Sequence, residues 1–151
     1  MFAIVRIRGN AGLRKEIRDT LEMLRLKAPN NCVLVPETES FKGMLQKCKD
    51  ACTWGEIEKE TLVKMLKKRL KVDNRRIDEK LLKEITGFNS FEEFADALIS
   101  GKVKLKDFKR FSPTFKLTPP SKGFKSVKEA FPKGDLGYRG KEINELIDRM
   151  I

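Results

Sequence analysis

The start of the chain combines a strand pattern with a helix pattern. Residues 2–8 alternate between two faces, with Arg6 and Arg8 on one of them, which predicts a strand closed by Gly9. Residues 13–26 repeat leucine and isoleucine at helical spacing. We therefore expect a helix that ends before Pro29.

Two further strands and a second helix follow. The apolar runs at 32–35 and 52–57 predict short strands, and Ser40 is expected to open the helix between them. The inner side of that helix carries apolar side chains at Phe41, Met44, Leu45 and Cys48. The order βαβαβ, with helices on one face, predicts an α+β fold with a two-layer core over residues 1–58 and a small sheet.

A helical extension is predicted over residues 59–100. Helical patterns run over 59–70 and 78–86. A third helix begins with a capping box, in which the Ser90 side chain accepts from the amide of Glu93 while Glu93 reaches back. We expect the apolar face of this third helix to point inward.

Residues 101–151 are rich in proline and glycine. Proline fixes φ and glycine permits positive φ, so we expect a basic arm with a definite path and little regular structure. A short amphipathic helix is predicted from about Lys141 to the end. The three segments are expected to form one structural unit.

The charge is concentrated in two segments. The formal net charge is +11, and residues 101–128 carry nine Lys or Arg against one acid, while residues 64–76 carry seven against one. The other 110 residues together are therefore slightly acidic. Clustered cations release condensed counterions when they neutralise phosphates, so a polyanion is the expected partner.

The arm also holds aromatic residues among its cations: Phe108, Phe111, Phe115, Phe124 and Phe131. Such side chains either stack on unpaired RNA bases or anchor the arm onto the protein's own core. The sequence leaves both interpretations open.

Catalytic chemistry is poorly represented. The chain has no histidine, which removes the usual general base near neutral pH, and three cysteines are too few for a four-ligand zinc site. We expect buried, inert thiols at Cys32, Cys48 and Cys52, no cofactor, and no small-molecule substrate. The absence of a signal-peptide pattern and of a membrane-length apolar run predicts a cytoplasmic protein without a membrane partner.

Gly43 interrupts an otherwise good helical pattern. Glycine in a helix costs about 1 kcal/mol relative to alanine, so something is expected to approach the backbone here. The approaching group is either a phosphate, with Lys42 beside it, or the sheet beneath the helix.

Three segments together resemble a known family: TLEMLRLKAPNNCVLVPETESFKGMLQKCKDACTWGEI (20–57), FKLTPPSKGFKSVKEAF (115–131) and GDLGYRGKEINELIDRM (134–150). They look like the archaeal form of the large-subunit ribosomal protein thirty family, a relative of eukaryotic large-subunit protein seven. The resemblance implies an antiparallel sheet in the core and a non-catalytic, structural role in the large (50S-type) subunit. It implies binding to the large (23S-type) rRNA, with the small 5S rRNA and neighbouring ribosomal proteins as further candidate partners.

The resemblance also implies which residues face RNA, and the charge pattern adds others. Carried over by position are Arg6, Arg8, Lys42, Gly43, Lys116, Lys122, Lys125, Arg139 and Lys141. Added from charge alone are Lys67, Lys68, Arg69, Arg75 and Arg76. The mechanism would be phosphate neutralisation with recognition of RNA shape.

Two other classes share some of these features. A DNA-compacting or chromatin-type protein would carry similar charge, although no helix-turn-helix or zinc-finger pattern is present. A metal-dependent nuclease would need a carboxylate cluster, and the adjacent acids Glu92 and Glu93 suit a helix start instead.

Overall fold

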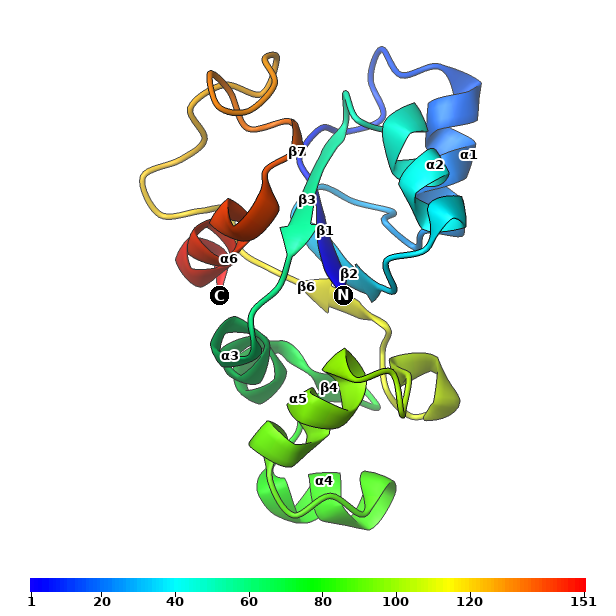
Figure 1. The fold of residues 1–151 in the computed structure, drawn as a ribbon, viewed down its shortest axis with the longest axis vertical. Coiled ribbons are helices and arrows are strands. Elements are labelled where there is room, and N and C mark those ends of the chain that lie inside the picture. Colours follow the sequence, from blue (N-terminus) through cyan, green and yellow to red (C-terminus); the bar gives the residue numbers. More distant parts are fainter.

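The βαβαβ unit forms in the predicted order in the computed structural model, which describes residues Met1–Ile151 (Figure 1). Its elements are β1 (Phe2–Arg6), α1 (Lys15–Met23), β2 (Asn31–Val35), α2 (Glu39–Lys47) and β3 (Cys52–Glu56). Strand β1 lies in the middle and pairs antiparallel with both β2 and β3. The α+β class and the antiparallel core are confirmed.

Two predicted helix boundaries were wrong. Helix α1 ends at Met23 rather than at Leu26, because the backbone of Arg25 turns into the left-handed region with φ of 61°. Helix α2 is capped by Thr38, whose hydroxyl accepts from the amide of Phe41 at 3.3 Å. Ser40, the predicted opening residue, already lies inside the first turn.

The helical extension contains the three predicted helices, α3 (Lys59–Arg69), α4 (Glu79–Thr86) and α5 (Phe91–Ile99). Ser90 caps α5 as predicted, since its side chain accepts from the amide of Glu93 at 3.3 Å. The return bond differs from the prediction, because the carboxylate of Glu93 accepts from the amide of Asn89 at 3.1 Å.

A short hairpin between α3 and α4 was not predicted. Strands β4 (Lys71–Val72) and β5 (Arg75–Arg76) pair antiparallel around Asp73 and Asn74. Both turn residues have positive φ, 51° and 66°, which matches the tight hairpin turns that asparagine and aspartate tolerate. The hairpin places two arginines at the tip of the extension.

The arm supplies both edges of the sheet. Strand β6 (Thr114–Lys116) pairs antiparallel with β2, and β7 (Gly137–Tyr138) pairs parallel with β3, giving the order β6-β2-β1-β3-β7. The rest of the arm before the last helix is irregular apart from the short 3-10 turns η1 (Leu105–Asp107) and η2 (Gly140–Glu142). The arm is thus built into the sheet.

Both faces of the sheet are covered (Figure 1). Helices α1 and α2 pack on the face that presents Phe2, Ile4 and Trp54, as the two-layer prediction required. The opposite face, with Ala3 and Val5, is buried under the extension and the final helix α6 (Ile143–Met150). This additional layer exists because the central strand is apolar on both faces. None of the helices combines the length and the apolar character needed to span a bilayer.

The tail glycines allow α6 to dock closely on β3. A Cβ at Gly55 would overlap the carbonyl oxygen of Gly140, so no other residue fits there. Asn144 fixes the same junction by accepting from the amide of Glu58 at 2.8 Å and donating to the carbonyl of Glu56 at 3.1 Å. The glycine-rich and Ile-Asn parts of the tail therefore serve docking within the protein.

Candidate nucleic-acid interface

The two basic segments of the sequence meet in space. Arg69 at the end of α3 donates to the carbonyl of Lys116 in β6 at 3.4 Å, and the amide of Ser112 donates to the carbonyl of Lys71 at 3.2 Å. Arg110 and Asp73 form an ion pair at 2.9 Å. We call residues 67–76 and 109–116 the basic seam.

The basic seam is strongly positive and largely unneutralised. It holds nine Lys or Arg and one Asp, a net charge of +8. Within it, only Lys67, paired with Glu92 at 3.2 Å, and Arg110 have a carboxylate within ion-pair distance. The cations that remain unpaired are Lys68, Arg69, Lys71, Arg75, Arg76, Lys109 and Lys116. Such a concentration of free cations attracts a polyanion.

Aromatic side chains support the seam from beneath. The rings of Phe94, Phe108 and Phe111 pack together with centroids 5.3 to 5.9 Å apart, and Phe115 is fully buried. Of the two interpretations of the arm aromatics, anchoring onto the core is therefore the one that Phe108, Phe111 and Phe115 follow. The other two arm rings are also half-buried, since Phe124 packs against the core and Phe131 lies beneath a guanidinium group.

Helix α2 presents a second exposed site, remote from the seam (Figure 1). Gly43 is exposed, and a Cβ built there would have no atom within 4 Å. This excludes tight packing against the sheet as the reason for the glycine. Lys42 lies beside it and makes only an exposed ion pair with Glu39 at 3.5 Å. The open backbone leaves room for a group from outside the chain.

The turn at residues 119–123 is fastened to the end of α6. Arg149 donates to the carbonyls of Ser121 and Gly123 at 3.3 and 3.2 Å, and the amide of Ser121 donates back to its carbonyl at 3.0 Å. Lys122 at the tip is exposed and has φ of 68°. The turn thus holds a lysine outward at a defined position.

Arg139 is buried, contrary to its prediction as an RNA-facing residue. It is 6% exposed and forms an ion pair at 2.8 Å with Asp135, which is 3% exposed. Its guanidinium also donates to the hydroxyl of Thr53 at 3.0 Å and lies over the ring of Phe131. The other carboxylate oxygen of Asp135 accepts from the amides of Lys125 and Ser126. Arg139 therefore organises the loop that displays Lys125, which is itself exposed.

Arg6 is also buried, at 2% exposure, because the end of β1 uses its side chain as a brace. Its guanidinium donates to the carbonyls of Arg8 and Leu26 and to the side chain of Asn10 at 2.6 to 2.8 Å. Burial lowers the pKa of Arg6 from its ordinary value. Arg8 is only half-buried and keeps part of its side chain at the surface.

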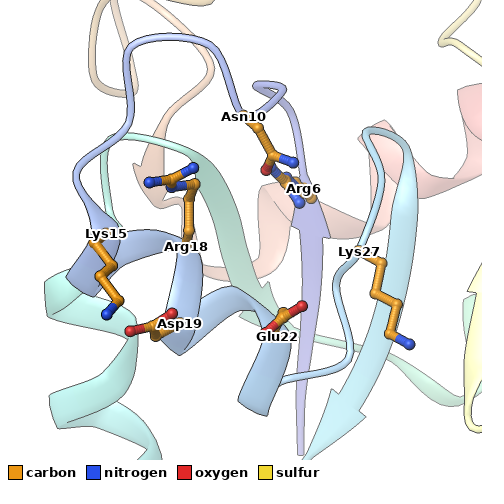
Figure 2. Close-up of a pocket in the computed structure, with 7 residues that line it drawn as sticks. All are labelled: Arg6, Asn10, Lys15, Arg18, Asp19, Glu22 and Lys27. Atoms are coloured by element: carbon orange, nitrogen blue, oxygen red, sulfur yellow. The ribbon is translucent and has the colours of Figure 1, made fainter.

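A polar recess opens beside Arg6, with a volume of about 430 Å³ and no apolar lining (Figure 2). Figure 2 shows Lys15, Arg18, Asp19 and Glu22 along α1 and Lys27 on the following loop. The recess has four cations and two carboxylates, so it is mildly positive. The periodicity of α1 gave no reason to select these residues.

The structure thus unites only part of the predicted set. Six residues come together in the seam: Lys67, Lys68, Arg69, Arg75, Arg76 and Lys116. The exposed residue Lys141, on η2, and the exposed residues of α2 and the arm loop lie elsewhere. Lys71 and Lys109 belong to the seam although the sequence analysis did not select them as site residues. Their proximity to the others depends on the pairing of β4 with the arm.

No catalytic or metal centre accompanies these surfaces. No group of three or more His, Cys, Asp or Glu side chains is placed to hold a metal ion. The three thiols are free and buried, with the sulfurs of Cys48 and Cys52 3.4 Å apart. Burial raises the pKa of Cys32 to about 12, so this thiol stays protonated and unreactive.

Comparison with known proteins identifies close relatives along the whole chain. The family described as Ribosomal protein L30p/L7e matches residues 2–51. Large ribosomal subunit protein uL30 of Nanoarchaeum equitans is 50% identical over all of this chain and 99% of its own length. The protein of the same name from Archaeoglobus fulgidus is 46% identical over 99% of both chains, and that of Thermofilum pendens is 48% identical over 100% and 99%. The chain therefore belongs to the ribosomal protein L30p/L7e family, in agreement with the resemblance found in the sequence.

Proposed function

We propose that this chain is a structural, non-catalytic constituent of the large ribosomal subunit in the cytoplasm, and that it binds large-subunit rRNA through the basic seam. Family membership supports the role in the subunit. The observation that carries the binding surface is the convergence of residues 67–76 and 109–116, which lie far apart in the sequence. The same membership argues against a DNA-compacting protein.

Phosphate neutralisation on a rigid support is the proposed mechanism. The seam backbone is tied to the sheet through β6 and rests on packed phenylalanine rings. A surface fixed in advance loses less conformational entropy when it meets a folded RNA. Release of counterions then contributes affinity that falls as salt rises.

Further RNA contacts are proposed at the separate exposed positions, and their members are Arg8, Lys42, Gly43, Lys122, Lys125 and Lys141. Arg6 and Arg139 are assigned a supporting role, since their guanidinium groups are bonded inside the protein. The 5S rRNA and neighbouring proteins of the subunit remain partners in this proposal.

A matched pair of variants tests the seam. The seam variant replaces Arg75, Arg76 and Lys116 by Gln, and the control replaces Lys80, Lys83 and Lys133, which are exposed cations outside the seam, by Gln. Both variants have the same reduction in positive charge. Binding to transcribed rRNA fragments is measured over a range of salt concentrations.

We expect the seam variant to lose affinity and to flatten the dependence of log K on log salt by about 0.7 to 0.9 for each phosphate that is no longer neutralised. The control should change both quantities much less. Equal effects of the two variants would show that net charge, and not the seam, determines binding.

A further inference from the structure

An apolar groove separates the βαβαβ core from the helical extension. It has a volume of about 360 Å³, and ten of its sixteen lining residues are hydrophobic. Leu34 of β2 and Phe41 of α2 line one wall, and Leu98 and Leu105, which flank the segment between α5 and β6, line the other. Figure 1 shows these elements on the two sides, with β6 crossing between them. The groove is chemically unlike the basic seam and the polar recess.

The edge of β2 becomes free inside this groove. The last residue of β2 paired with β6 is Val33, opposite Thr114, and Pro113 before it has no amide hydrogen to continue the ladder. The carbonyl of Asn30 faces the β6 side, where it accepts from Leu117 at 3.1 Å. Because strand residues alternate, the amide and carbonyl of Leu34 face the same side. No loop or side-chain hydrogen bond uses them.

The rim of the groove is cationic. Arg25, Lys104 and Lys106 are exposed, none has a carboxylate within ion-pair distance, and no acidic residue lines the groove. Arg25 is held at φ of 61°, a costly conformation for a bulky residue, while its carbonyl accepts from the hydroxyl of Thr114 at 3.1 Å. The neighbouring Met23 is 73% exposed, the most exposed large apolar side chain of the chain.

We propose that this groove docks an extended segment of another protein of the large subunit, apolar in its middle and acidic at its ends. The segment adds to β2 at Leu34, places alternate side chains in the groove, and meets the cationic rim with its carboxylates. An RNA strand suits this groove poorly, because apolar walls and a free strand edge offer nothing to phosphates. The inference rests on the proposed function for the identity of the partner as a subunit protein.

Photo-crosslinking in intact subunits is the first test. Benzoylphenylalanine replaces Met23, with Lys83 as the control position, since both are exposed and their replacement leaves the core intact. Purified large subunits are irradiated, and the crosslinked products are identified by mass spectrometry. We expect the Met23 position alone to crosslink to one protein segment with apolar residues between acidic ones.

Crosslinks to rRNA, to a protein segment without that pattern, or to nothing would overturn the groove assignment. Failure of the chain to copurify with the subunit would instead contradict the proposed function. The second test does not depend on the subunit, so the two failures are distinguishable.

The second test uses the free full-length protein and a synthetic peptide of alternating valine and threonine with glutamates at both ends. The chain has five methionines, and Met1 and Met23 line the groove, whereas Met65 and Met150 are buried elsewhere. We expect the methyl NMR signals of the first two to shift on titration. The double change Lys104→Glu and Lys106→Glu should weaken binding at least about tenfold, because it reverses the rim charge.

The matched change of Lys80 and Lys83 to Glu, which alters the net charge equally, should weaken binding far less. A peptide with lysines at its ends should not bind. Absence of binding, equal binding of the lysine peptide, or equal effects of the two charge reversals would refute the groove.

Discussion

Gly43 offers a test in which protein stability and RNA binding should change in opposite directions. It is the fifth of the nine residues of α2, and nothing within the chain lies within 4 Å of a Cβ placed there. Alanine in place of glycine in a helix interior is favourable by about 0.8 to 1.0 kcal/mol. The change Gly43→Ala should therefore raise the free energy of unfolding by about 1 kcal/mol, or the Tm by roughly 2 to 4 °C for a chain of this size.

The same change should weaken binding to rRNA, because the added methyl group occupies the space where we propose that the RNA backbone approaches. Urea unfolding of the free protein gives the first quantity, and salt-controlled binding to an rRNA fragment gives the second. Gly87 is the matched control, since a Cβ at this position would also have no atom within 4 Å, but the residue caps α4 with φ of 80°.

Gly87→Ala should lower the free energy of unfolding, because alanine does not tolerate that φ, and should leave rRNA affinity unchanged once the protein is folded. The reasoning about Gly43 would be refuted by a decrease in stability in Gly43→Ala. Unchanged rRNA affinity of that stabilised variant would refute the proposed approach of RNA to α2.

Three further predictions concern the buried pair, the lone tyrosine and the arm. Arg139→Ala should destabilise the protein by about 3 to 5 kcal/mol in urea unfolding, because it leaves Asp135 buried without its partner, while the salt slope of RNA binding by the folded fraction stays unchanged; a reduced slope would make Arg139 a direct contact. Tyr138 donates to Glu56 at 2.6 Å, and this bond raises the pKa of the phenol. Its stabilising contribution should be complete below about pH 10 and lost as pH rises through the raised folded-state pKa. Because it is the only tyrosine, tyrosinate absorbance should show a midpoint above about 10 that falls in Glu56→Ala, and a midpoint at or below 10 would contradict the bond. Replacing the arm lysines by Ala should flatten the salt dependence of RNA binding by about 0.7 to 0.9 for each phosphate released, and an unchanged affinity and slope would remove them from the interface: Lys116, Lys122 and Lys125.

The sequence predicted the long elements well because they carry periodicity and caps. Helices α3, α4 and α5 begin within a residue of their predicted starts, and Ser90 caps as expected. The hairpin around Asp73 and the edge strands β6 and β7 have only two or three residues a strand, too few for any period to show. Their formation depends on neighbours that are distant in the chain.

The candidate site was predictable as charge but not as geometry. Arg6 and Arg139 look like any other basic residues in the sequence, and only the fold supplies the carbonyls and the carboxylate that bury them. Lys71 and Lys109 join the seam because the hairpin lies against the arm, a contact between segments of separate sequence. Gly43 was ambiguous until the space around it was known to be open.

The most direct test of the central claim is sedimentation of a cell lysate through sucrose gradients at low and high salt, followed by detection of this chain. The account predicts that the protein comigrates with the large subunit until the salt concentration is high. The seam variant should leave the subunit at lower salt than the matched charge control. A light, soluble peak of the unmodified protein at every salt concentration would contradict a role as a ribosomal constituent.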